Sequence, residues 1–256
     1  MRGMIDSHAH LCGAELFPGW REIAAKARDA GIEKIMIICR SMEEAKRAFD
    51  LAGQDSMFDV AAGLHPNDIL DTPFEEWERF MDLLRDVRVK AVGEIGIDYS
   101  FYETVVPQVL QKEVFIRQID LANELNKPAI IHMRHAAEDT RRYIKCHLKA
   151  PGIMHGYSGG YKAMKEFLDL GMYISFSPAA ILESKQDDAR KVAAEVPLDR
   201  ILVESNGPFK APTSMTGTIH GPETVASVVD YICKVRDMMC EDLTEAVYHN
   251  YRRLFS

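Results

Sequence analysis

Side chains that bind divalent metal ions lie at the ends of short apolar segments in this sequence. His8 and His10 follow the first such segment, Glu94 ends another, and His132 and His155 each end one more. Imidazole nitrogens and carboxylate oxygens are common protein ligands of zinc and related ions. Parallel strands that each finish in a ligand bring such side chains together at one mouth of a barrel. The pattern therefore predicts a metal site and hydrolytic chemistry.

The first ligand candidates are two residues apart. Because side chains alternate along a strand, His8 and His10 should point to the same side and could chelate one ion. Glu94 lies between glycines in Gly93-Glu94-Ile95-Gly96. Its two oxygens could each hold one of two ions about 3.5–4 Å apart that share a water or hydroxide nucleophile. A helix-capping or salt-bridging carboxylate is the alternative for Glu94.

Other candidates follow later segments of the same kind. His132 and His155 hold the same relative position on successive predicted strands, so their rings should converge on a second ion, unless each is a core histidine with a backbone partner. His65, before Pro66, could contact a leaving group or a carboxylate, or pack in a turn. Arg134 offers a planar pair of donors that suits a phosphate, with a salt bridge to an acid as the alternative.

Eight apolar segments alternate with segments of helical periodicity, and these elements would position the candidates. The predicted strands span residues 3–7, 34–39, 58–63, 89–93, 128–132, 152–155, 172–176 and 200–204. The predicted helices span residues 19–30, 41–53, 73–86, 107–125, 138–148, 161–170, 186–196, 223–239 and 242–254. Ser41 followed by Glu44 predicts a capping box at the start of the second helix.

This alternation predicts the fold class. Strands that alternate with helices form right-handed crossovers and a parallel sheet, and nearly continuous apolar strands indicate burial on both faces. We therefore predict an α/β protein with one domain over residues 1–256, a (β/α)8 TIM barrel with the metal site at the C-terminal mouth of the strands. A doubly wound open sheet is the alternative, but the glycine-rich phosphate turn typical of that fold does not follow an early strand.

Composition limits the function classes. The 256 residues are 47% hydrophobic and carry a net charge of -8 at pH 7, which argues against sequence-independent nucleic-acid binding through a broad basic surface, though not against a local basic cleft. Five cysteines without a CxxC pair suit reduced thiols. The sequence does not begin with a basic region followed by an apolar run, and no apolar run reaches about 18 residues. We therefore expect a cytoplasmic protein without a membrane partner. We also expect a monomer or weak oligomer.

Several motifs in order resemble TatD-type metal-dependent deoxyribonucleases, a branch of the amidohydrolase-like barrels. They are Asp6-Ser7-His8-Ala9-His10, Gly63-Leu64-His65-Pro66 and residues 93–99, 111–115, 128–134, 155–159 and 202–208. The resemblance covers nearly the whole chain and implies a (β/α)8 barrel, two or three divalent ions and phosphodiester hydrolysis. It implies that His8, His10 and Glu94 bind the first ion, and that Glu94, His132 and His155 bind the second. Such mixed ligands admit zinc, manganese, nickel or magnesium.

Asn206 departs from the family, which carries an aspartate after the eighth strand. The resemblance implies that this residue ligates the first ion and orients or deprotonates the attacking water. Asparagine has nearly the same size but no charge, and it cannot act as a base. Three explanations stay open: an engineered substrate trap, a natural enzyme in which Glu204 or a bridging hydroxide is the base, and a non-catalytic relative.

A smaller departure concerns substrate contacts. Gly156-Tyr157 replaces the Cys-Phe pair that the family often has, so Tyr157 could stack on a base or pack at the rim. We expect a hydrolase that acts on single strands or ends of DNA, with Glu94, Glu204, Asn206 and His65 as catalytic candidates. A metal-dependent ester or amide hydrolase, such as a D-aminoacyl-tRNA deacylase, and a non-catalytic nucleic-acid-binding relative are the alternatives.

Overall fold

The computed structural model describes residues 3–100, 106–182, 187–209 and 220–255. Eight parallel strands form one sheet whose spatial order follows the sequence. They are β1 (Met4–Ala9), β2 (Ile32–Cys39), β3 (Phe58–Ala62), β4 (Val89–Asp98), β5 (Ala129–Arg134), β6 (Gly152–Met154), β7 (Tyr173–Phe176) and β8 (Ile201–Val203). The sequential order of parallel neighbours confirms the predicted barrel and excludes an open sheet with a reversal of strand order.

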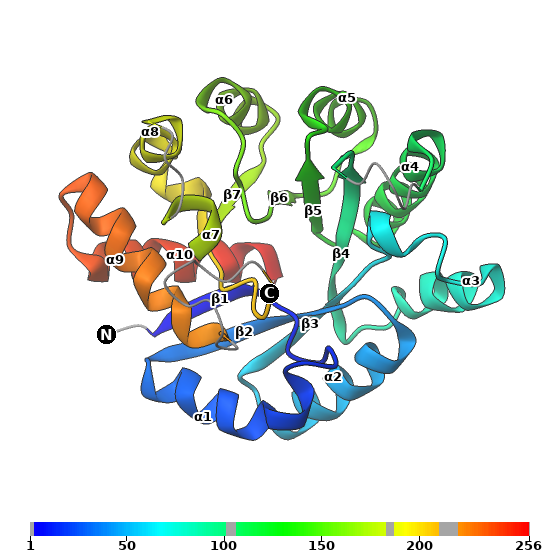
Figure 1. Cartoon of the computed structure of the whole chain (residues 1–256), viewed down its shortest axis with the longest axis horizontal. Coiled ribbons are helices and arrows are strands. Elements are labelled where there is room, and N and C mark those ends of the chain that lie inside the picture. Colours follow the sequence, from blue (N-terminus) through cyan, green and yellow to red (C-terminus); the bar gives the residue numbers. More distant parts are fainter. Residues whose placement is uncertain (1–2, 101–105, 183–186, 210–219, 256) are drawn as a thin grey trace.

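Helices surround the strands as an outer ring (Figure 1). The α-helices are α1 (Trp20–Asp29), α2 (Met42–Gln54), α3 (Phe74–Leu83), α4 (Gln108–Leu125), α5 (Ala137–His147), α6 (Tyr161–Asp169), α7 (Pro178–Ile181), α8 (Asp187–Glu195), α9 (Val225–Arg236) and α10 (Cys240–Phe255). Short 3-10 helices include η1 (Phe17–Gly19), η2 (Pro66–Asp68), η3 (Leu198–Arg200) and η5 (Pro222–Thr224). No helix within the described ranges is long and apolar enough to cross a membrane.

The start of α2 confirms one of the two hydrogen bonds of the predicted capping box. The Ser41 hydroxyl accepts a hydrogen bond from the Glu44 backbone N–H at 3.2 Å. The Glu44 carboxylate in turn accepts one from the Arg40 backbone N–H at 2.7 Å. In a complete capping box Glu44 would accept from Ser41, the N-cap residue, so the second bond lies one residue earlier than predicted. This pairing fixes the backbone at the point where β2 leaves the barrel and α2 begins.

The barrel closes beside residues that the sequence singled out. The backbone N–H of Asn206 donates to the carbonyl of His8 at 2.9 Å, and the N–H of His10 donates to the carbonyl of Gly207 at 2.9 Å. The Asp6 carboxylate also accepts from the Ser205 backbone N–H at 2.9 Å. The segment after β8 is thus joined to β1 by main-chain bonds, which set Asn206 next to the N-terminal histidines.

Three strands extend beyond their predicted ends, and three others end one residue earlier than predicted. β4 continues to Asp98, so Glu94 lies inside the strand and does not end it. β5 likewise continues past His132, and β1 includes His8. The glycines around Glu94 resemble a strand end in sequence, but β4 keeps its pairing with β5 beyond them, with Asp98 opposite Arg134. The short helix α7 was not predicted because four residues carry too little periodicity.

Candidate metal site

A single carboxylate stands at the centre of the candidate site. Glu94 is 4% exposed. Its Oε2 lies 3.4 Å from His8 Nε2 and 3.5 Å from His10 Nε2. Its Oε1 lies 2.7 Å from His132 Nδ1 and 2.8 Å from His155 Nε2. The two oxygens therefore face the two ligand pairs that the sequence predicted, one pair each.

The flanking glycines explain how a carboxylate can occupy this position. The register between β4 and β5 shifts between Gly93 and Ile95, so Glu94 has no partner in the ladder. A Cβ on Gly93 would lie 2.5 Å from the Cβ of Ile130. Gly96 has a φ of +150°, and a Cβ there would lie 2.0 Å from the carbonyl oxygen of His132. Only glycine allows β4 to bulge and still pass this close to β5.

The first ligand set has the spacing that a shared ion requires. His8 Nε2 and His10 Nε2 lie 3.2 Å apart, and both face Glu94 Oε2. Ligand atoms about 2.0–2.1 Å from a tetrahedral ion lie roughly 3.3 Å from one another, and the three separations of 3.2, 3.4 and 3.5 Å agree with that value. The Nδ1 atoms of both histidines are buried and have no hydrogen-bond partner among the described residues. The donor set therefore fits a divalent ion.

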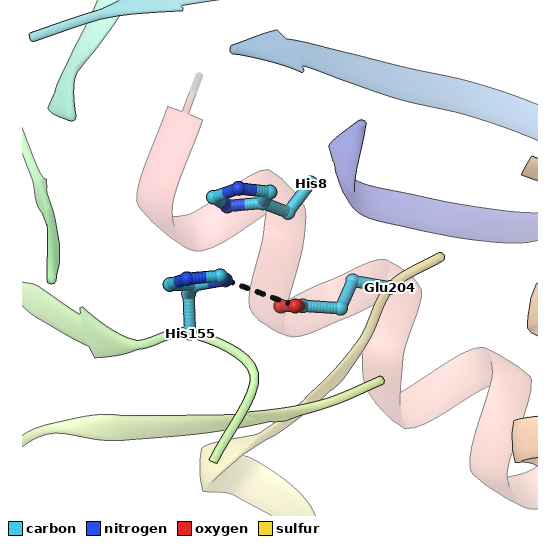
Figure 2. A group of neighbouring side chains, drawn as sticks. All are labelled: His8, His155 and Glu204. Carbon is cyan, nitrogen blue, oxygen red and sulfur yellow. Dashed lines mark hydrogen bonds and ion pairs between the residues drawn. The ribbon is translucent and has the colours of Figure 1, made fainter. Parts of the chain in front are cut away.

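The second set is oriented by two further carboxylates. His132 Nε2 lies 3.0 Å from Asp98 Oδ2, and His155 Nδ1 lies 3.0 Å from Glu204 Oε1. Each ring therefore presents one nitrogen to Glu94 and the other to an acid, the arrangement that orients metal-binding histidines in proteins. Figure 2 shows the His155 ring parallel to that of His8, with Nδ1 directed at Glu204; the two ring centroids are 3.9 Å apart.

Burial and neighbouring charges shift the pKa values of the side chains in this cluster. Burial raises the pKa of Glu94, but the imidazoles of His155, His65 and His132 outweigh it and hold that pKa well below its usual range. Burial lowers the pKa of His155, but the carboxylates of Glu94 and Glu204 raise it to about 10. Burial and the neighbouring His155 lower the pKa of His8. The two carboxylates thus favour the charged form of His155, whereas burial favours the neutral form of His8, in which an imidazole can bind a metal ion.

His65 lies beside Glu94 but presents a proton to it. Its Nδ1 accepts a hydrogen bond from the Asn67 backbone N–H at 3.1 Å. In the neutral ring Nε2 must then carry the proton, and Nε2 lies 3.4 Å from Glu94 Oε1. Burial holds the pKa of His65 below its ordinary value, which keeps the ring neutral. The arrangement suits a hydrogen-bond donor to substrate rather than a metal ligand.

The remaining predicted residues divide into those at the cavity and those behind it. Asn206 and Arg134 line two neighbouring cavities of about 370 and 570 Å³ beside the ligands. Arg134 is exposed and forms no ion pair with any described acid. Glu204 is fully buried and lines neither cavity, so its position favours orienting His155 over taking a proton from water. A further cavity of about 600 Å³ between η2, α3 and α4 is lined mainly by apolar side chains and holds none of the ligands.

Tyr157 does not reach either cavity. Its side chain is 3% exposed, its hydroxyl donates to the carbonyl of Gly160 at 3.0 Å, and its ring packs edge-on against Phe167. This placement corrects the expectation that Tyr157 stacks on a base, because the ring is held in the core by its own hydrogen bond. The sequence placed Tyr157 after the sixth strand, but it could not predict whether the side chain points into the core or into the cavity.

Three polar residues of the cavity of about 370 Å³ were missed in the sequence. Asp98 lies four positions after Glu94 on β4, a spacing that places both on one side of a strand and could have identified it. Asn67 donates to Asp98 across the cavity at 3.4 Å. Arg40 lines the same cavity as the ligands, and its sequence position after β2 gave no distinctive signal.

Comparison with known proteins agrees with this architecture. Residues 5–256 match the family described as TatD related DNase. A Bacillus subtilis protein named "Uncharacterized metal-dependent hydrolase YabD" is 31% identical over 255 residues, which cover 98% of each chain. The crystal structure of YjjV, a TatD homologue from Escherichia coli, superimposes with a TM-score of 0.91 at 26% identity, covering 98% of this chain and 97% of that chain.

A relative with a more specific name matches over a shorter stretch. The "3'-5' ssDNA/RNA exonuclease TatD" of Shigella flexneri is 27% identical over 215 residues, covering 83% of this chain and 82% of its own. The family match spans nearly the entire sequence and includes every strand that carries a candidate ligand. The chain belongs to the TatD related DNase family.

Proposed function

We propose that the chain is a metal-dependent hydrolase that cleaves phosphodiester bonds of DNA at single-stranded ends. The observation that carries the proposal is Glu94, whose two oxygens face two separate histidine pairs and which lines one cavity with His10, His132 and His155. A carboxylate shared in this way could hold two divalent ions, which would make a water molecule more acidic and would neutralise charge on the phosphoryl oxygens. His8, His10 and Glu94 would hold the first ion, and Glu94, His132 and His155 the second.

The chain's own residues then have distinct tasks. Arg134, exposed at the rim and free of described acidic partners, binds the non-bridging oxygens of the phosphate. His65 donates its Nε2 proton toward the phosphate or the leaving oxygen. Asp98 and Glu204 hold His132 and His155 in the tautomer that leaves a lone pair for the centre. Asn206 lies where a carboxylate would orient water, and its neutral amide makes this step slow.

Substrate class follows from the cavity and the charge of the chain. A cavity of about 370 Å³ admits a nucleotide more readily than an intact duplex. The net charge of -8 disfavours long contacts along a nucleic-acid backbone. The exonuclease name of the Shigella relative supports action at strand ends. Zinc, manganese, nickel and magnesium remain the candidate ions. We further propose that the protein works in the cytoplasm as a monomer or weak oligomer.

The test combines metal analysis with hydrolysis. We expect the purified protein to bind divalent ions and to release nucleotides from a labelled single-stranded oligonucleotide when it is loaded with manganese or magnesium. Glu94→Gln should lower the content of both ions, because Glu94 contacts both histidine pairs. Glu124→Gln, in an exposed ion pair with Arg85, is the matched control. Release of an acyl group without nucleotide release would indicate an ester hydrolase, and binding without any turnover a non-catalytic relative.

A further inference from the structure

Arg40 lines the cavity that holds the ligands but belongs to neither ligand set. Its Nε donates to Asp68 Oδ2 at 2.6 Å, and its Nη2 donates to Asp68 Oδ1. A guanidinium has five N–H donors. The pair with Asp68 uses two of them, and the others have no acceptor among the described residues. Arg40 therefore keeps unused donors inside a cavity built for phosphate chemistry.

Both the backbone and the side chain of Arg40 are fixed in place. The backbone N–H is held by Glu44 in the first turn of α2. Asp68 belongs to η2, and its own N–H donates to the carbonyl of His65 at 3.0 Å. The guanidinium is thus attached to the same turn that carries His65. Such preorganisation lowers the entropy cost of binding a ligand.

The Arg40–Asp68 pair differs from an ordinary surface ion pair. Its side chains are only 24% and 27% exposed, whereas those of the bidentate pair Arg85–Glu124 are 48% and 59% exposed. The charge of Glu94 also acts on Arg40. Burial lowers the pKa of Arg40, but Asp68 and Glu94 together raise it. Arg40 is therefore a permanent positive charge close to the ligand cluster.

Two guanidinium groups in one cavity indicate two anionic groups in the ligand. Arg134 lies at the end of β5 and Arg40 directly after β2, so they approach the cavity from different strands of the barrel. Phe209 adds a flat apolar surface to the same cavity, with its ring edge-on to His10 at 4.8 Å and its centroid 5.8 Å from the Arg40 guanidinium carbon. A nucleotide unit offers this combination of an anion and a flat apolar group.

We propose that Arg40, oriented by Asp68, forms a subsite for a second phosphate of the substrate, next to the phosphodiester that is cleaved. This inference rests on the proposed function, because Arg134 is taken to hold the reacting phosphate. It predicts a preference for strand ends that carry a terminal phosphate over ends that carry a hydroxyl. The guanidinium of an arginine can donate two parallel charge-assisted hydrogen bonds to a phosphate, which favours the phosphate more strongly than the single ammonium of a lysine does.

Equilibrium binding tests the subsite without requiring turnover. The probes are thymidine 3′,5′-bisphosphate and thymidine 5′-monophosphate, titrated calorimetrically into the metal-loaded protein. The wild type should bind the bisphosphate about 10-fold more tightly or better. Arg40→Met should reduce this ratio to about 1–2 without altering metal content, and Arg40→Lys should restore part of it. Arg85→Met is the control and should leave the ratio unchanged.

Hydrolysis of two dinucleotides by the same proteins separates this inference from the proposed function. The dinucleotide pTpT carries a terminal 5′-phosphate, and TpT carries a hydroxyl there. Faster cleavage of pTpT by the wild type, lost in Arg40→Met while TpT cleavage is retained, supports both. Cleavage of both dinucleotides with the same pTpT/TpT ratio in wild type and Arg40→Met overturns the subsite and leaves the nuclease. No cleavage of either, with an Arg40-dependent binding preference, overturns the nuclease and leaves the subsite. Equal losses for both binding probes would also overturn the subsite, because Arg40 would then act on the shared phosphate.

Discussion

The backbone N–H of Asn206 donates to the carbonyl of His8 at 2.9 Å, so the residue that departs from the family pattern is fixed beside the first ligand pair. Asn206 has a φ of +54°, a left-handed conformation that asparagine adopts at lower cost than most residues. The backbone around position 206 is thus built to deliver a short polar side chain to the centre.

Restoring the carboxylate should restore rate. We expect Asn206→Asp to speed hydrolysis by about 10²-fold or more, because a carboxylate can accept the proton of the attacking water, a role worth about 10²–10⁴-fold. Matched nuclease assays at saturating manganese or magnesium measure the effect. Asn126→Asp is the control, since Asn126 has a similar φ of +52° at the end of α4, away from the ligands. Equal rates for Asn206→Asp and wild type would show that another group already acts as base.

The two carboxylates behind the histidines should matter for metal binding and not for substrate affinity. Asp98→Asn and Glu204→Gln keep the size of the side chain but replace a charged group that can only accept by a neutral amide that can accept or donate, so the ring tautomer is no longer fixed. We expect each to weaken metal binding by about 10–100-fold, measured by competition with a chelator. Asp59→Asn is the comparison, because Asp59 bonds the Tyr251 hydroxyl on β3 and contacts none of the ligands. Unchanged affinity in Asp98→Asn would contradict an orienting role.

The sequence predicted the barrel because its signals are local and repeated. Alternating apolar and amphipathic segments are visible without any knowledge of pairing, and the capping box at Ser41 and Glu44 follows from two side chains three residues apart. The ligands were found for the same reason, since each follows an apolar run. Strand ends were less predictable: Gly93 and Gly96 resemble a break, and only the pairing of β4 with β5 shows that the strand continues.

Interactions between distant segments could not be predicted from the sequence. Arg40 and Asp68 are 28 residues apart, and their pairing depends on how η2 returns over the end of β2. The side toward which Tyr157 turns depends on the space beside Phe167. Glu204 and Asn206 are two residues apart, yet one lies behind His155 and the other at the cavity, because β8 ends at Val203 and strand alternation no longer applies.

Arg134 should contribute to binding of phosphate and not of metal. We expect Arg134→Ala to raise KM for a single-stranded oligonucleotide by roughly 10-fold or more, since a charge-assisted contact is worth about 1.5–3 kcal/mol. Metal content should stay at the wild-type value. Arg141→Ala is the control, because Arg141 pairs with Glu166 on the outer helices. A proportional rise in KM for an uncharged ester would indicate a general distortion of the cavity.

Removal of metal should expose the titration of His155. Glu94 and Glu204 raise the pKa of His155 to about 10 from an ordinary 6.5. A raised histidine pKa contributes stability that is fully present below pH 6.5 and is lost as the pH rises through about 10. In chelator-treated protein, the free energy of unfolding of wild type minus that of His155→Gln should therefore fall between pH 7 and 10, by up to about 1.4 kcal/mol per pH unit.

Urea unfolding at four pH values measures this difference. Glu204→Gln should make its dependence on pH weaker, because one of the two stabilising carboxylates is removed. Metal-loaded protein should lack this slope, since a bound ion requires the neutral ring. If the free energies of unfolding of metal-free wild type and His155→Gln change equally with pH, the imidazole is not held in its charged form between the two carboxylates.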